Sequence, residues 1–195
     1  AWKFTQKFWR TVSSCENVFN VDVNIKPLVF DKISIDFRKK VHKNLKSITD
    51  SITNFQMNVA IAKIHELTTE LNIFIEKNDS QEWCKKEALI ILLRVTEPMM
   101  PHLAEECWEK IGNRTSIIET LWPKVEEQLL VDEEIIIIIQ INGKKRGQLT
   151  LPNDSNENDV YLAAIALDNI RKIITPKTII KKKIFIPNKI INIVI

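Results

Sequence analysis

The segment Ile135–Gly147, which reads IIIIIQINGKKRG, carries the strongest structural signal in this sequence. Its run of isoleucines predicts a buried strand, because β-branched side chains pack well on a pleated surface. Asn142-Gly143 predicts a type I′ hairpin turn, since that turn needs a positive φ at both central residues. Lys144, Lys145 and Arg146 follow the turn, so we expect three cations at the hairpin tip, as a candidate contact for a polyanion. The alternative is a solvated turn that binds nothing.

The segments around this hairpin form a pattern that extends over nearly the whole chain. Gln140–Gly147 resembles a hairpin in the C-terminal domain of bacterial-type leucyl-tRNA synthetases. Further segments resemble the same family in the same order: Phe4–Val12, Met57–Ala62, Glu97–Trp108, Leu121–Pro123 and Ile186–Val194. The Pro-His-x-Ala-Glu-Glu-x-Trp pattern also occurs in related class I synthetases. The hairpin together with the ending around Asn192 is specific to the leucine enzymes.

This resemblance implies a function for a longer protein of which the chain is the C-terminal part. Such a protein is a cytoplasmic, monomeric ligase that joins leucine to tRNA(Leu), using ATP with Mg. Its catalytic and editing domains would lie upstream, so this segment is expected to be non-catalytic and to hold no cofactor. Its expected partners are tRNA(Leu) and the rest of the synthetase, with no membrane. Two alternatives remain: a free-standing RNA-binding module, and the equivalent region of a valine, isoleucine or methionine enzyme.

The charge of the chain is unevenly distributed. The net charge of the 195 residues is +3. Residues 1–139 carry 18 Lys and Arg against 21 Asp and Glu, whereas residues 140–195 carry 10 against 4, a change from −3 to +6. A basic C-terminal unit points to a phosphate-bearing partner. The competing interpretation is a basic tail without a partner.

The sequence offers no candidate for catalysis or for binding a metal. The three cysteines are odd in number and far apart, so they predict neither a disulfide framework nor a metal site, and they fit a reducing compartment. With three glycines the chain has no phosphate-cradling glycine loop. No apolar stretch is long enough to span a membrane. The chain does not begin with Met and Trp2–Trp9 already predicts helix, which suggests a segment of a longer protein.

The predicted fold class is α followed by α+β: a helical bundle over residues 1–130, with a connector over about 113–130, and a small ββαββ-like domain over 131–195. Apolar spacing predicts helices over residues 2–15, 37–55, 61–75, 81–96 and 101–111. The second helix should bury a stripe that includes Phe37, Ile48 and Phe55 and should point Arg38 to another face. Ser80 is expected to cap the fourth helix, and His102 and Trp108 to serve as cap and core.

In the small domain, we expect strands at 134–141, 146–151, 178–186 and 190–195, with a helix at 157–167. Isoleucines should supply the apolar faces, among them Ile179, Ile184 and Ile186. A second candidate for contact with RNA lies on the third strand: Lys181, Lys182 and Lys183. As an alternative to an RNA contact, Arg146 pairs with Glu133 or Glu134.

Overall fold

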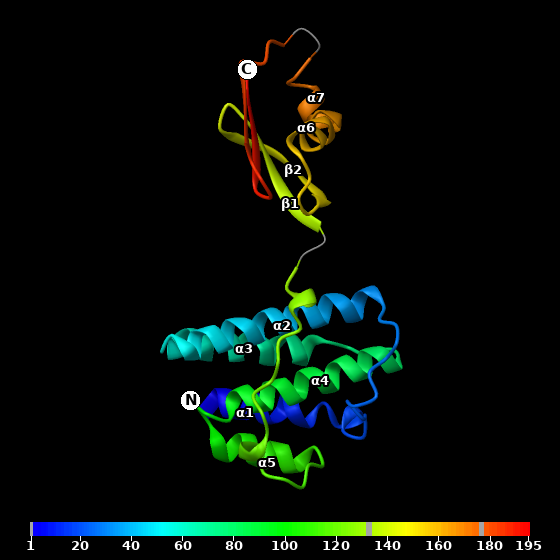
Figure 1. Ribbon diagram of the computed structural model, residues 1–195, viewed down its shortest axis with the longest axis vertical. Helices are drawn as coiled ribbons and strands as arrows, with labels where there is room; N and C mark the ends of the chain where they lie inside the picture. Colours follow the sequence, from blue (N-terminus) through cyan, green and yellow to red (C-terminus); the bar gives the residue numbers. More distant parts are fainter. Residues whose placement is uncertain (1, 132–133, 176–177) are drawn as a thin grey trace. The chain divides into compact units, whose positions relative to one another are not determined.

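The structure is a computed structural model that describes residues 2–131, 134–175 and 178–195. The chain divides into a helical unit that ends at Leu130 and a small unit that begins at Val131 (Figure 1). Each unit has its own hydrophobic core. Within the described residues, none of the helices is long and apolar enough to cross a membrane.

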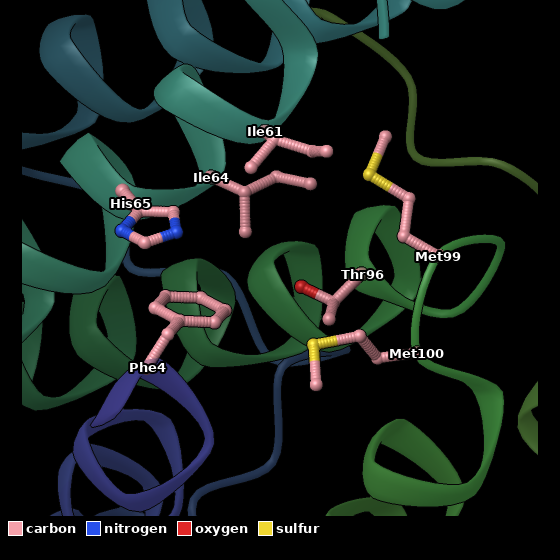
Figure 2. Close-up of a pocket in the computed structure, with 7 residues that line it drawn as sticks. All are labelled: Phe4, Ile61, Ile64, His65, Thr96, Met99 and Met100. Atoms are coloured by element: carbon pink, nitrogen blue, oxygen red, sulfur yellow. The ribbon is translucent and has the colours of Figure 1, made fainter. Parts of the chain in front are cut away.

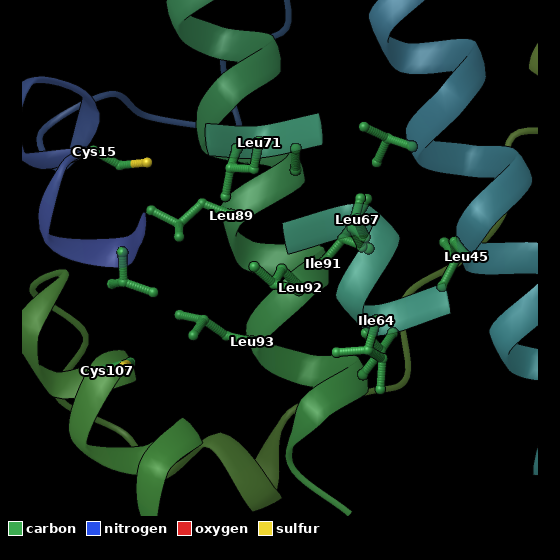
Figure 3. Packing of buried hydrophobic residues seen from close by; sticks show 14 of the residues in the cluster. Cys15, Leu45, Ile64, Leu67, Leu71, Leu89, Ile91, Leu92, Leu93 and Cys107 are labelled. Atoms are coloured by element: carbon green, nitrogen blue, oxygen red, sulfur yellow. The ribbon is translucent and has the colours of Figure 1, made fainter. Parts of the chain in front are cut away.

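The helical unit is built from longer helices joined by loops and short 3₁₀ turns (Figure 1). The helices are α1 (Trp2–Ser13), α2 (Lys32–Thr53), α3 (Met57–Ile73), α4 (Asp79–Thr96) and α5 (Pro101–Lys110). The central helix is α4, because nearly every side chain of its apolar run is buried. Figure 3 shows Leu89 of α4 beside Leu71 of α3, whereas Leu93 of α4 points toward the side of Cys107.

The predicted apolar stripe of α2 is correct up to the last turn of the helix. Ile48 is 0% exposed, and Phe37 is buried against Phe74, with ring centroids 3.8 Å apart. Phe55 was expected in this stripe but is 86% exposed, because α2 ends at Thr53 and Phe55 takes a left-handed φ of 56°. The third helix is predicted to reach residue 75, but α3 ends at Ile73, so Ile75 lies beyond the helix and is exposed.

Two predicted helix caps are wrong. The N-cap of α4 is Asn78, whose side chain accepts a hydrogen bond from the Gln81 backbone N–H at 3.0 Å, so Ser80 lies inside the first turn. At α5, His102 is exposed and the helix starts without a side-chain cap. Trp108 is buried as predicted, and its Nε1 donates to the Thr115 carbonyl at 2.9 Å.

Arg38 is the largest correction in the helical unit, because it is buried and only 4% exposed. Its Nε and Nη2 donate to both carboxylate oxygens of Glu87, at 2.7 and 2.9 Å, and Nη2 also lies 2.6 Å from Glu126. The guanidinium also lies over the rings of Phe30 and Trp83. Glu126 belongs to the connector, so this ion pair fixes the connector on α2 and α4.

The small unit is a four-stranded mixed sheet with helices on one face (Figure 1). Its elements, in chain order, are β1 (Glu134–Ile141), β2 (Lys144–Pro152), α6 (Glu157–Ala166), α7 (Asp168–Arg171), β3 (Lys182–Ile186) and β4 (Ile190–Val194). The strand order is β2-β1-β4-β3, with β1 and β4 parallel and the other pairs antiparallel. A helical unit followed by a small unit that contains a sheet agrees with the predicted order.

The core of the small unit lies between the sheet and its helices. Ile137 and Ile139 of β1 and Ile191 of β4 pack with Val160 and Ile170 of the helices. Because side chains alternate along a strand, the neighbouring residues point to the other face of the sheet. Within this unit, that second face is not covered by the helices.

Three of the isoleucines predicted for the apolar face of the third strand are exposed, whereas Ile180, which was also expected there, packs on the core. Ile184 and Ile186 lie on the uncovered face and are exposed, whereas Phe185 packs on the core. Ile179 is exposed as well, because β3 begins at Lys182 and not near residue 178.

Candidate nucleic-acid interface

The hairpin turn has the conformation that the sequence predicts. Asn142 has a φ of 50° and Gly143 a φ of 77°, as a type I′ turn requires. The second strand begins directly after the turn, two residues earlier than predicted. Lys144 pairs with Ile141 and Lys145 with Gln140, so these cations belong to the paired end of β2 and are held by its ladder.

The turn is fastened to the end of β4 by three hydrogen bonds. The Asn142 N–H donates to the Ile193 carbonyl at 3.0 Å, and the Ile195 N–H donates to Asn142 Oδ1 at 3.0 Å. The Gly143 N–H donates to Asn192 Oδ1 at 3.1 Å. The two motifs singled out in the sequence therefore meet in space, and we call this set of bonds the hairpin clasp.

A β-bulge follows the turn on β2. Gln140 pairs with Lys145, but the next residue of β1, Ile139, pairs with Gly147. Arg146 is thus the extra residue and has no partner in the register. Bulges redirect side chains at sheet edges, and β2 is an edge strand.

Asn169 of α7 supports this bulge, and no local sequence pattern indicates this contact. Its Nδ2 donates to the carbonyl of Arg146. A Cβ on Gly147 would lie 3.3 Å from Asn169 Nδ2 and 3.5 Å from Leu167 Cδ1, so the strand approaches the helix closely at this glycine. The bulge is held between β1 and α7 and is not a loose turn.

The six predicted contact residues form two groups on opposite edges of the sheet. Lys144, Lys145 and Arg146 are exposed on β2, and Lys181 to Lys183 are exposed at the start of β3. Both groups lie at the same end of the sheet, because Lys144 and Lys183 belong to one cross-strand row through Ile141 and Ile193. The structure therefore does not join the six into one continuous patch.

The faces of the third-strand lysines differ, as expected for a strand. Lys182 pairs with Val194, which places it on the uncovered face. Lys183 pairs with the buried Ile193, and its Nζ lies 3.5 Å from the centroid of the Tyr161 ring. A cation–π contact of this kind partly engages the ammonium group of Lys183.

Neither group of cations is neutralised by the part of the small unit that the structure describes. None of the six forms an ion pair with a described residue, and Lys145 makes only a 3.3 Å hydrogen bond to Gln148. Glu133 and the side chain of Glu134 lie outside the described residues, so their pairing with Arg146 stays a prediction.

The described residues bring together one cluster with the composition of a metal site. His42, Glu87 and Glu126 offer ligand atoms within 4.8 Å of one another. Arg38 already pairs with both carboxylates, and His42 Nδ1 accepts the Glu126 backbone N–H at 3.1 Å. Both carboxylates are therefore engaged by Arg38, and His42 Nε2 lies 3.5 Å from Glu87 Oε1. We assign the cluster to the anchoring of the connector.

The cysteines lack the properties of nucleophiles. All three are free and buried. Burial raises the pKa of Cys84 and of Cys107 to about 12, so both thiols stay protonated at neutral pH.

Comparison with known proteins identifies the family. Residues 36–162 match the family described as the anticodon-binding domain of tRNA ligase. The chain belongs to this family. The matched region begins within α2, extends through α5 and includes the hairpin with Lys144, Lys145 and Arg146.

Curated relatives agree with this assignment and are leucine–tRNA ligases. The enzyme of Parvibaculum lavamentivorans is 35% identical over 100% of this chain, and that of Maricaulis maris is 33% identical over 99%. A Rhodopseudomonas palustris enzyme is 33% identical over 98%. The chain spans 22% of the length of each relative and corresponds to the C-terminal part.

A solved structure has the same fold. The ternary LeuRS–tRNA–LeuAMS complex from Agrobacterium radiobacter matches with a TM-score of 0.78 and 24% identity. The match covers 98% of this chain and 24% of that chain. At this identity the likeness concerns the fold alone.

Proposed function

We propose that this chain is the tRNA-binding C-terminal part of a leucine–tRNA ligase. The curated relatives support the leucine specificity, and the solved neighbour of the same fold was crystallised with tRNA. Because the chain spans 22% of those relatives, the reaction itself belongs to other parts of the ligase. The complete protein would join leucine to tRNA(Leu) with ATP and Mg, as a cytoplasmic monomer.

The observation that carries this proposal is the group of unpaired cations on the clasped hairpin. Lys144, Lys145 and Arg146 are exposed and lack described carboxylate partners. Their backbone is held by the pairing with β1, by Asn192 at the turn and by Asn169 at the bulge. Such cations release counterions from a phosphate backbone without first breaking an ion pair. Little conformational freedom is lost on binding, because the hairpin is already ordered.

The same geometry supports backbone contact and not the reading of bases. Lys and Arg side chains that touch phosphates position a protein on a nucleic acid without specifying its sequence. Lys181, Lys182 and Lys183 stand on the other edge, about 14 Å away by three strand spacings. We propose that both edges contact the sugar–phosphate backbone of one tRNA. The hairpin cations should contribute more to the binding free energy, because on the other edge the ammonium group of Lys183 is already engaged by the Tyr161 ring.

A charge-removal experiment on the complete ligase tests this proposal. Lys144, Lys145 and Arg146 are replaced together by Ala, and leucylation is compared with leucine-dependent ATP–pyrophosphate exchange. We expect KM for tRNA to rise at least tenfold and the exchange reaction, which needs no tRNA contact here, to remain unchanged. The matched control removes three exposed cations that face carboxylates in the helical unit: Lys40, Lys46 and Lys63.

An unchanged KM for tRNA in the hairpin variant would exclude these residues from the interface. Absence of leucylation by the complete wild-type protein would exclude the ligase assignment itself. A chain that binds RNA without belonging to an active ligase would support the free-standing RNA-binding module.

A further inference from the structure

The helical unit contains an apolar pocket of about 290 Å³ between α1, α3 and the junction of α4 and α5 (Figure 2). Phe4 comes from α1, Ile61 and His65 from α3, and Met99 and Met100 from the junction. Figure 2 shows these side chains around one common space. The pocket does not contain any of the cations proposed to contact tRNA.

The lining favours an apolar occupant. Phe4 stacks on His65, with ring centroids 3.8 Å apart and an interplanar angle of 20°. Burial, with a smaller effect from Lys7, lowers the pKa of His65, so its ring is neutral at pH 7. Met99 and Met100 are flexible thioethers that can adapt to the shape of an inserted side chain.

An apolar stripe on α3 extends from the pocket to the surface. Met57, Ile61, Ile64 and His65 are spaced so that they share one face of the helix. Met57 and Ile61 are each 44% exposed, although both are large and apolar. The adjoining turn between α2 and α3 also exposes Phe55, and α1 begins at this end of the unit (Figure 1). Apolar surface gathered around a pocket marks an interaction site.

We infer that this pocket is the docking site for the part of the ligase polypeptide that precedes α1, and that it receives an apolar side chain from it. The inference rests on the proposed function. Relatives of this chain carry more than three-quarters of their length outside the matched region, because the chain spans only 22% of them. A polypeptide leading into α1 emerges beside the pocket, since α1 itself contributes Phe4.

The chemistry of the pocket argues for this occupant over tRNA. A phosphate backbone needs cations, and the pocket is lined by apolar side chains, a threonine and a neutral histidine. An exposed apolar patch around a pocket is instead typical of a contact with protein.

Site-specific photo-crosslinking in the complete ligase tests the inference. A benzophenone-bearing residue replaces Ile61, and mass spectrometry identifies the crosslinked peptides. We expect crosslinks within one molecule to peptides that precede Trp2. The matched control carries the label at Ile73, which lies on the same helix, is also exposed (59%) and is not part of the pocket. We expect it not to give these peptides.

Crosslinks from Ile61 only to tRNA, only to a second ligase molecule, or to nothing in a folded protein would overturn the docking site. If the Ile61 variant does not fold, the label at Met57, one turn earlier on the same face, gives the same readout. Leucylation by the unlabelled complete protein separates the two proposals. If that protein is active and its labelled form gives no crosslink, the docking site alone is contradicted. If it cannot charge tRNA with leucine and its labelled form gives the crosslink, the proposed function alone is contradicted.

Discussion

In the helical unit, Lys40 lies 3.0 Å from Glu70 and Lys85 lies 2.6 Å from Glu76, whereas Lys144 and Lys145 of the small unit have no described carboxylate partner. Both units carry many cations, and several of those in the helical unit form ion pairs within the fold, among them Lys26, Arg38 and Lys85. The difference indicates that the number of cations does not decide whether a surface can bind phosphate. What decides it is whether those cations are already paired with carboxylates. It also predicts that removing cations affects stability in one unit and binding in the other.

The first prediction concerns the buried cation of the helical unit. Arg38→Ala should lower the free energy of unfolding by about 3–5 kcal/mol, because it leaves Glu87 buried without its partner. Urea denaturation measures the change. The control Lys46→Ala removes an exposed pair with Asp50 and should cost less than about 1 kcal/mol. Equal losses in the two variants would contradict the distinction between a buried ion pair and an exposed one.

The second prediction tests the core of the helical unit. Ile48→Ala should cost on the order of 2–5 kcal/mol, because the side chain is completely buried. Ile73→Ala, at an exposed position, should change the free energy of unfolding by less than about 0.5 kcal/mol. A small effect at Ile48 would contradict the assignment of this face of α2 to the core.

Much of the fold follows from local sequence patterns. The α2 stripe, the apolar run of α4 and the Asn142-Gly143 turn each depend on residues that are close in the chain, so periodicity and turn chemistry predict them. The corrections arise where partners are distant. Arg38 is buried because it pairs with Glu87 and Glu126. These residues lie 49 and 88 positions away in the sequence, so no local pattern predicts the pairing.

The candidate site was predictable to the same extent. The cations and the turn are adjacent in the sequence, so local patterns predict them. Asn169 supports Arg146 from 23 positions away, and no local pattern predicts this contact. The clasp joins Asn192 to Gly143 across 49 positions, and only the family resemblance drew attention to Asn192. Phe55 is exposed because α2 ends at Thr53, two residues before the end of its apolar period.

The third prediction concerns acid stability of the helical unit. Burial alone would raise the pKa of Glu87, but hydrogen bonds from Arg38 and His42 and the charge of Arg38 lower it below its ordinary value of 4.5. The unfolded chain therefore takes up a proton more readily than the folded one. Stability from Glu87 is complete above pH 4.5 and is lost as the pH falls through the lower pKa of the folded state. Thermal melts from pH 6 to pH 3 should show this loss, with a shallower slope for Glu87→Gln.

The fourth prediction concerns the hairpin clasp. Asn192→Ala should remove the bond to the Gly143 N–H and cost about 1 kcal/mol in the small unit. Amide hydrogen exchange at Gly143 should accelerate. Asn192→Asp keeps an acceptor oxygen and should retain more of the protection. Equal exchange rates in wild type and Asn192→Ala would show that the clasp does not order the turn.

The most direct test of the account is the salt dependence of tRNA binding by the hairpin variant. Replacing Lys144, Lys145 and Arg146 by Ala should weaken binding and reduce the slope of log K against log salt by roughly two to three. Binding to tRNAs of other specificities should fall in parallel, because backbone contacts carry no sequence information. The melting temperature should stay the same, and the control that removes Lys40, Lys46 and Lys63 should keep the wild-type slope. An unchanged slope in a folded hairpin variant would contradict the claim that these unpaired cations contact RNA.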